Sequence, residues 1–281
     1  MAHWVAGTAS LASLASLASI AAVPVAAVVA VFAAIFVSTA YAGGQSYEGY
    51  AHATSDDKLL YQESHWLYTT EGVGQHLILY RCANGQPFAR KRVNTAPGAA
   101  TPDFEMLDAR SGYREGVRTR DGRREVFTQV DAHAPERRVL VSIRENTIID
   151  AGIDAFVRAH WDSLSDTGIS PLPFLVPSRL GYFDFTARKL RDTPMDGHDV
   201  RWFRMSLASW YGFAAPHLEM GYDARTHELR EYRGPSNIRG DGNRDLNVRI
   251  DFPPAERHAD VALADVEHAA EMPLNGRCVF P

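Results

Sequence analysis

Short β-forming runs separated by tight turns recur along most of this chain, and they constrain its fold more than any other feature. Between Tyr47 and Arg144, such runs are joined at Asn84-Gly85 and at Asp121-Gly122. Both dipeptides favour two-residue turns between antiparallel strands. Further runs follow at Tyr182–Leu190, Val200–Ala208, His217–Tyr222, His227–Arg233 and Leu246–Phe252. The pattern predicts a mainly β fold of around ten antiparallel strands.

One helix is predicted within this series of strands. Its apolar residues recur on one face with helical spacing. They are Ile149, Ile153, Phe156, Val157, His160 and Leu164. Asp150 stands where a helix N-cap is expected, and Gly168 follows the helix. Because a long sheet must close or cover its edges, we expect a single curved antiparallel meander sheet, a half-barrel or open barrel, covered by this main α-helix. A second, short helix is expected within 255–270.

The first 42 residues contain no Asp, Glu, Lys or Arg. Ile20–Val37 is an apolar run broken only by Pro24, and Ala40-Tyr41-Ala42 matches the pattern that signal peptidase reads. We expect residues 1–42 to be a signal peptide and residues 43–281 to form a single β-rich periplasmic domain. The alternative is an uncleaved inner-membrane anchor, because 18 apolar residues approach the length that spans a bilayer. Membrane contact is expected only through this segment.

Cys82 and Cys278 are the two cysteines of the chain. In an exported protein they favour one disulfide, with two free buried thiols as the alternative. No His spacing typical of a metal site surrounds them, so no metal is expected. The net charge of −5 argues against nucleic-acid binding. We interpret the basic run Arg90-Lys91-Arg92 as a solvated strand end.

Common catalytic motifs are incomplete. Gly234–Ile238 lacks the final glycine of a nucleophile elbow, and Ser236 and Asn237 are interpreted as turn-forming residues. His227-Glu228 begins a zinc-protease motif but lacks its second histidine. No glycine-rich phosphate loop joins a strand to a helix, so no cofactor is expected. A non-enzymatic role is favoured over an enzymatic one.

Two regions combine apolar residues with a few polar groups, as a small-molecule or lipid pocket requires. They are Phe156–Trp161 and Phe174–Phe185; in addition, Ser209–Pro216 is a predicted loop with three aromatic residues. The candidate ligand-binding residues are Phe156, Arg158, His160, Trp161, Arg179, Tyr182 and Trp210. The same composition fits an ordinary sheet–helix core, and the aromatic loop also fits a barrel-end plug or a partner surface.

Several short segments carry a family resemblance. They include Leu79-Tyr80-Arg81, Gly85–Lys91, Arg158–Trp161, Phe174–Ser178 and Tyr232–Ile238. Together they resemble a family of uncharacterised exported proteins of Gram-negative bacteria, and this resemblance implies no particular activity. The order of elements is also similar to that of the periplasmic lipoprotein-carrier superfamily, whose curved sheet and helices surround an apolar cavity. That similarity concerns the fold and does not imply function.

The leading functional hypothesis is an exported protein that binds an apolar or amphipathic ligand, such as lipid, in the bacterial envelope. One alternative is an envelope protein–protein interaction module without a small ligand, acting through 209–216 or Tyr232–Asn237. The other is an unrecognised hydrolase, which requires His and carboxylate side chains to converge in a pocket.

Overall fold

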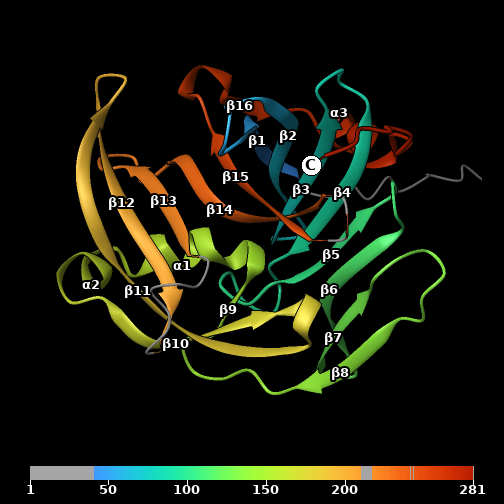
Figure 1. Cartoon of the computed structure of the whole chain (residues 1–281), viewed down its shortest axis with the longest axis horizontal. Coiled ribbons are helices and arrows are strands. Elements are labelled where there is room, and N and C mark those ends of the chain that lie inside the picture. Colours follow the sequence, from blue (N-terminus) through green and yellow to red (C-terminus); the bar gives the residue numbers. More distant parts are fainter. Residues whose placement is uncertain (1–40, 210–216, 241, 243, 281) are drawn as a thin grey trace, which may run out of the picture. The chain divides into compact units, whose positions relative to one another are not determined.

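The computed structural model describes residues 41–209, 217–240, 242 and 244–280 (Figure 1). The predicted signal segment therefore lies outside the described residues, apart from the backbone of Tyr41 and Ala42 at the start of the first strand. Within the described part, no helix combines the length and the apolar character needed to cross a membrane.

Sixteen strands of the described residues join in one sheet. The first eight are β1 (Tyr41–Ala53), β2 (Leu59–Thr70), β3 (Val73–Cys82), β4 (Pro87–Asn94), β5 (Asp103–Asp108), β6 (Tyr113–Arg120), β7 (Arg123–Gln129) and β8 (Arg137–Val141). The others are β9 (Ile148–Ile149), β10 (Ile169–Val176), β11 (Gly181–Met195), β12 (His198–Leu207), β13 (Leu218–Asp223), β14 (Leu229–Arg239), β15 (Asp245–Asp251) and β16 (His258–Val261). The expected mainly β, mostly antiparallel open sheet is confirmed, with more strands than expected.

The sheet consists of two meanders, and the first strand of one pairs with the last strand of the other. Strands β1 to β8 pair in succession, as do β9 to β15, and β1 pairs with β15 to connect the two series. Strand pairs are antiparallel except β9 with β10, and β16 adds to β1. Both predicted tight turns are present, because Gly85, Asp121 and Gly122 adopt positive φ angles between paired strands. Local turn chemistry therefore determines much of the register.

The single helix predicted from Ile149 to Leu164 is wrong in detail. The segment forms a 3-10 turn, η1 (Asp150–Gly152), and two short helices, α1 (Ile153–Ala159) and α2 (Trp161–Asp166), with a break at His160. Asp150 is not an N-cap: its φ is +31°, and its carboxylate binds a lysine on β4 instead. A buried tertiary partner thus replaces the predicted local cap.

Helices α1 and α2 pack on one part of the sheet, as the sequence predicts (Figure 1). Phe156, Trp161 and Leu164 are buried against side chains of β10 to β13, among them Phe203 and Met220. The predicted short closing helix is also present as α3 (Leu263–Glu271). It packs Val266 and Ala269 against Leu77 of β3.

The interpretation of Arg90-Lys91-Arg92 as a solvated strand end is wrong. Because side chains alternate between the faces of a strand, Lys91 points to the same side as Ala89 and Val93, and all three are buried. Arg90 and Arg92 point to the opposite face and donate hydrogen bonds to the carbonyls of Met272 and Ala270.

The predicted disulfide is present between Cys82, at the end of β3, and Cys278, with an S–S distance of 2.10 Å. It attaches the C-terminal segment to the sheet. The guanidinium of Arg110 lies 4.5 Å from the ring centroid of Phe88 and 4.3 Å from that of Phe280. The same side chain donates to the carbonyl of Cys278, so covalent and non-covalent contacts hold the same segment.

Gly152 allows η1 to approach the loop at 95–102 closely. An added Cβ would lie 2.1 Å from the Ala100 carbonyl oxygen, which is backbone and cannot rotate away. We expect Gly152→Ala to lower the unfolding free energy by about 3 kcal/mol through overpacking. Urea unfolding followed by circular dichroism measures this. Gly181→Ala is the control, because its Cβ would meet only the Arg179 carbonyl at 3.8 Å; equal effects of the two variants would contradict the expectation.

Candidate functional site

A cavity of ≈ 340 Å³ lies between the two meanders and the η1–α1 segment. Its lining comes from β2, β3, β4 and β6 of the first meander and from β10, β11, β13, β14 and β15 of the second, so strands of both meanders border one space. The apolar wall includes Ile78, Ile153, Phe174, Val176, Phe185, Leu218, Met220, Leu229, Ile250 and Phe252. Such a wall suits the hydrocarbon part of a ligand.

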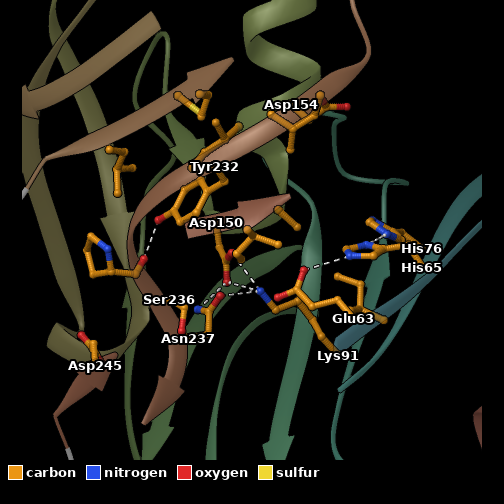
Figure 2. Close-up of a pocket in the computed structure, with 18 of the residues that line it drawn as sticks. Glu63, His65, His76, Lys91, Asp150, Asp154, Tyr232, Ser236, Asn237 and Asp245 are labelled. Atoms are coloured by element: carbon orange, nitrogen blue, oxygen red, sulfur yellow. Dashed lines mark hydrogen bonds and ion pairs between the residues drawn. The ribbon is translucent and has the colours of Figure 1, made fainter. Parts of the chain in front are cut away.

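A buried polar group centred on Lys91 interrupts this apolar wall (Figure 2). The Lys91 Nζ donates to both carboxylate oxygens of Asp150, each at 3.0 Å, and to Oδ1 of Asn237 at 2.7 Å. Asn237 in turn donates from Nδ2 to Glu115 at 2.9 Å and to Asp150 at 3.1 Å. We call Lys91, Glu115, Asp150 and Asn237 the lysine cluster.

Four elements supply the lysine cluster, namely β4, β6, η1 and β14. Lys91 and Glu115 come from neighbouring parts of the first meander, where alternation directs both side chains inward. Asn237 lies in β14, which is irregular between Pro235 and Arg239. The interpretation of Ser236 and Asn237 as turn residues is therefore wrong, because both belong to a strand. The positive φ of Asp150 is uncommon for a non-glycine residue and recurs at functional sites.

A second buried chain of hydrogen bonds runs from Glu63 through two histidines. Glu63 Oε2 lies 2.9 Å from Nε2 of His65, and Nδ1 of His65 lies 3.0 Å from Nε2 of His76. The ring of Tyr47 stacks on His65 with a centroid separation of 4.3 Å. Figure 2 shows this Glu63–His65–His76 chain beside the lysine cluster, and the Glu63 carboxyl points toward Lys91.

Burial dominates the ionisation of this chain. Desolvation raises the pKa of Glu63 to about 7, although the nearby Lys91 acts in the opposite direction. Desolvation lowers the pKa of His65 to about 3 and places the pKa of His76 well below its ordinary value. Both imidazoles are therefore neutral at pH 7, whereas Glu63 is close to half protonated.

The protonation of Glu63 sets the tautomers of both neutral histidines. An ionised Glu63 accepts from Nε2–H of His65, which leaves Nδ1 of His65 to accept from Nε2–H of His76. A protonated Glu63 donates to Nε2 of His65, and His65 then donates from Nδ1 to His76. One proton on Glu63 thus reverses the direction of two hydrogen bonds.

Carboxyl groups dominate the ionisable lining. Glu63, Glu115, Asp150, Asp154 and Asp245 face the cavity, against the single ammonium of Lys91 among the described lining residues. Desolvation, the largest contribution in each case, raises the pKa of Glu115 and of Asp154. Carboxyl groups therefore outnumber ammonium groups in the described lining, and arginines outside it pair with two of them, Asp154 and Asp245.

The chemistry available here is recognition of a polar group and proton exchange at Glu63. In the described part of the chain, no group of three or more His, Cys, Asp or Glu side chains has the arrangement of a metal site. Lining hydroxyls are present on Ser178 and Ser236, and the Ser236 hydroxyl donates to the carbonyl of Ile238. Neither serine hydrogen-bonds to His65 or His76 in the described residues.

Of the residues that the sequence nominated for ligand binding, none of the six that the structure describes lines the cavity. Phe156 and Trp161 are buried in the α1–α2 core. His160 stacks on Phe156 and hydrogen-bonds to its carbonyl, and Arg158 pairs with Asp154 at 3.1 Å. Through this ion pair Arg158 contacts a lining residue.

The remaining nominees are dispersed. Arg179 is exposed in η2 (Pro177–Arg179), and the Tyr182 hydroxyl donates to the carbonyl of Ser142. Trp210 and the 210–216 part of the predicted aromatic loop lie outside the described residues. The ligand-binding role of these seven residues stays a prediction. The Phe174–Phe185 stretch does supply lining residues, namely Phe174 and Phe185 at its two ends.

Sequence reasoning missed the polar residues that the cavity brings together. A period-two pattern would have found part of them, because Glu63 and His65 share a strand face with Tyr61, and Lys91 shares one with Val93. Charged residues at core positions of a strand are rare without partners. No local pattern identifies Asp150 and Asn237 as those partners.

Comparisons with known proteins find similarity in structure only. No protein-family model and no curated protein matches the sequence. A DUF1329 family protein from Desulfovibrio piger is similar at 12% identity, over 81% of this chain and 90% of that chain, with a TM-score of 0.29. A putative outer membrane lipoprotein-sorting protein domain from Vibrio parahaemolyticus is similar at 8% identity, over 81% and 91%, with a TM-score of 0.29.

MucB, in its complex with MucA(peri), is similar at 10% identity over 78% of this chain and 94% of that chain, with a TM-score of 0.13. At these identities and scores, the functional assignment depends on the cavity itself.

Proposed function

We propose that this chain is a binding protein of the bacterial envelope that encloses an amphipathic ligand in the cavity between its two meanders. The observation that carries the proposal is a cavity of ≈ 340 Å³ with an apolar wall and a buried polar group on one side. That combination matches a ligand with a hydrocarbon part and one polar end. An ordinary core would instead be filled by its own side chains.

The envelope location rests on two features of the chain. The uncharged N-terminal segment has the composition of an export signal. The Cys82–Cys278 disulfide fits an oxidising compartment. The structure describes neither the signal segment nor its removal, so export is part of the proposal. Cysteine trapping of the disulfide in cells, compared between periplasmic and cytosolic fractions, tests it.

A hydrolase is the second candidate, because histidine and carboxylate side chains do converge in the cavity. His65 and Glu63 are hydrogen-bonded there at 2.9 Å. A triad also requires a nucleophile beside the histidine. The absence of a serine contact to either histidine in the described residues favours binding over turnover. If the wild type hydrolysed short p-nitrophenyl esters and His65→Gln did not, a hydrolase would become the favoured function.

Filling the cavity is expected to abolish binding. Ala151 lines the cavity from η1, and Ala151→Phe should weaken binding of decanol at least tenfold, because the larger side chain occupies the space of the ligand. Isothermal titration calorimetry measures the affinity. Ala159→Phe is the matched control, since Ala159 is exposed at the end of α1. The proposal fails if decanol binds neither the wild-type protein nor the control, or if it binds Ala151→Phe equally well.

Native mass spectrometry of the protein purified from its envelope fraction complements this test. An extra mass that lipid extraction removes is the expected result. A bare polypeptide mass, together with no uptake of decanol, would contradict the proposal.

A further inference from the structure

The hydrogen-bond donors of the Lys91 ammonium are all directed to acceptors within the protein. An ammonium group has three N–H donors. Lys91 directs its donors to the two oxygens of Asp150 and to Asn237, at 2.7 to 3.0 Å. Its side chain is only 4% exposed. Lys91 therefore has no free donor for a phosphate, sulfate or carboxylate, and an anionic ligand would meet an excess of carboxyl groups instead.

Acceptor capacity, in contrast, remains unfilled. The Glu63 side chain is 8% exposed, and only its Oε2 has a hydrogen-bond partner among the described residues. Its other oxygen has no hydrogen-bond partner among the described residues and is open to the cavity, on a carboxyl that lines it (Figure 2). Asp154 Oδ1 is buried without a hydrogen bond of good geometry, although the Tyr222 hydroxyl lies close enough to lower the Asp154 pKa.

The cavity offers hydrogen-bond acceptors but no free ammonium donor, so a well-matched ligand would supply hydrogen-bond donors or positive charge. Among the described lining residues, five carboxyl groups face one ammonium, and arginines outside the lining pair with Asp154 and Asp245, which leaves Glu63 without an arginine partner. A buried polar atom without a partner, such as Asp154 Oδ1, costs free energy, and a ligand that donates hydrogen bonds or carries positive charge also satisfies the open acceptor of Glu63. A neutral hydrocarbon would leave this cost unchanged.

We propose that the ligand has an amine or ammonium group at its polar end, and that this group binds the free oxygen of Glu63 while its hydrocarbon part lies along Phe174, Phe185 and Leu218. This inference rests on the proposed function and specifies its ligand class. The alkylammonium end enters beside the lysine cluster without replacing any of its contacts.

Binding of the cation is coupled to loss of one proton. Glu63 is mostly protonated below neutral pH in the empty cavity, because burial raises its pKa to about 7. The arriving ammonium favours the carboxylate, so the Glu63 proton passes to solvent and the charge of the site is conserved. The two histidines then switch tautomer with Glu63 and stay neutral.

Other ionisable groups surround Glu63 and define its environment. His65 shares β2 with it, and Lys91 faces it from β4. Asp150 faces it from η1. The buried tyrosines whose ionisation Glu63 opposes are Tyr47 on β1, Tyr61 on β2, Tyr80 on β3 and Tyr232 on β14. The tyrosine pKa values are raised, so none of them titrates near neutral pH.

Three ligands of equal chain length test the proposal: decylammonium, decanol and decanoate. Decylammonium should bind tightest at pH 8 and decanoate weakest. Below a Glu63 pKa of about 7, each pH unit should weaken decylammonium binding tenfold, giving about a 100-fold loss between pH 8 and pH 5. Decanol affinity should stay constant over this range. Calorimetry in buffers of different ionisation enthalpy should report release of one proton per decylammonium at pH 6.

Glu63→Gln distinguishes binding at Glu63 from a general attraction of cations by the lining carboxyl groups. The variant should bind decylammonium at pH 8 about 100-fold more weakly than wild type, with no pH dependence, and should bind decanol normally. Asp245→Asn, at the other end of the cavity lining, is the matched control and should keep the pH dependence. At pH 6, where Glu63 of the empty cavity is mostly protonated, ¹⁵N NMR should show His65 and His76 changing tautomer on decylammonium binding in the wild type only.

The outcomes distinguish the two proposals. If none of the three ligands binds, the proposed function itself fails. If decanol binds but decylammonium binds no tighter at pH 8, the ligand class is wrong and the binding function stands. If Glu63→Gln keeps the pH dependence, the coupling to Glu63 is wrong.

Discussion

A variant with both Cys82 and Cys278 replaced by alanine is expected to lose about 5 kcal/mol of unfolding free energy. The bond closes a loop with a sequence separation of 196 residues. In the chain-entropy model, opening a loop of that length restores about 5 kcal/mol of conformational freedom to the unfolded state. Alanine is chosen over serine because a serine hydroxyl at the buried position 82 would lack a hydrogen-bond partner.

Non-covalent contacts around the bond do not substitute for it. Arg110 stacks on Phe280 and donates to the Cys278 carbonyl, but these contacts form only after the C-terminal segment has docked. The unfolded state gains freedom regardless of them. Urea unfolding of the variant, with and without reductant, measures the difference; reductant should destabilise the wild type to the level of the variant and leave the variant unchanged. A variant as stable as the oxidised wild type would show that the bond contributes no loop-closure entropy.

Lys91→Met is expected to lower the unfolding free energy at pH 8 by about 3 to 5 kcal/mol. The change keeps the length of the side chain and removes the charge that three acceptors surround. Asp150 then remains largely enclosed without its cation. Removing one partner of a buried ion pair costs more than replacing both, because the remaining charge stays desolvated.

The loss should depend on pH with a definite sign. Lys91 lowers the pKa values of Glu63 and Glu115, against the larger effect of burial. Without it, both folded-state pKa values rise further above their unfolded values. A carboxyl with a raised folded pKa favours folding while it is protonated, and this contribution is lost as the pH rises through the folded pKa. The variant should therefore be less impaired at pH 5 than at pH 8.

Two controls accompany this measurement. Lys189→Met should cost less than about 1 kcal/mol, because Lys189 is partly exposed and pairs with Asp192 on the surface. Adding Asp150→Asn to Lys91→Met should restore part of the lost stability at pH 8. If Lys91→Met equals the wild type at both pH values, the lysine cluster does not stabilise the fold.

Much of the fold could be predicted from the sequence where local chemistry decides structure. Asn84-Gly85 and Asp121-Gly122 each form the turn that their φ preferences favour. The strand count is underestimated because β9 and β16 are short and lack a clear alternating pattern. The predicted helix is divided at His160, where a continuous apolar face gave no indication of a break.

The candidate site could not be predicted in the same way. Lys91 follows the alternation of β4 and is inward by that pattern alone, yet a run of three basic residues suggested a solvated face. Its partners Asp150 and Asn237 lie 59 and 146 residues further along the chain. Such partners become visible only when the two meanders meet. Sequence periodicity can therefore indicate that a charged side chain points into the core, but it cannot identify the residues that pair with it.

The pairing of β1 with β15 has a consequence for how the molecule is made. Tyr50 lies opposite Asp251, so the first of the described strands to be synthesised acquires one of its two main neighbours almost last. Until then its open edge can recruit strands from other nascent chains. Such distant pairing raises the contact order and slows folding. Efficient production should therefore depend on holdase chaperones that shield the early strand until the polypeptide is nearly finished.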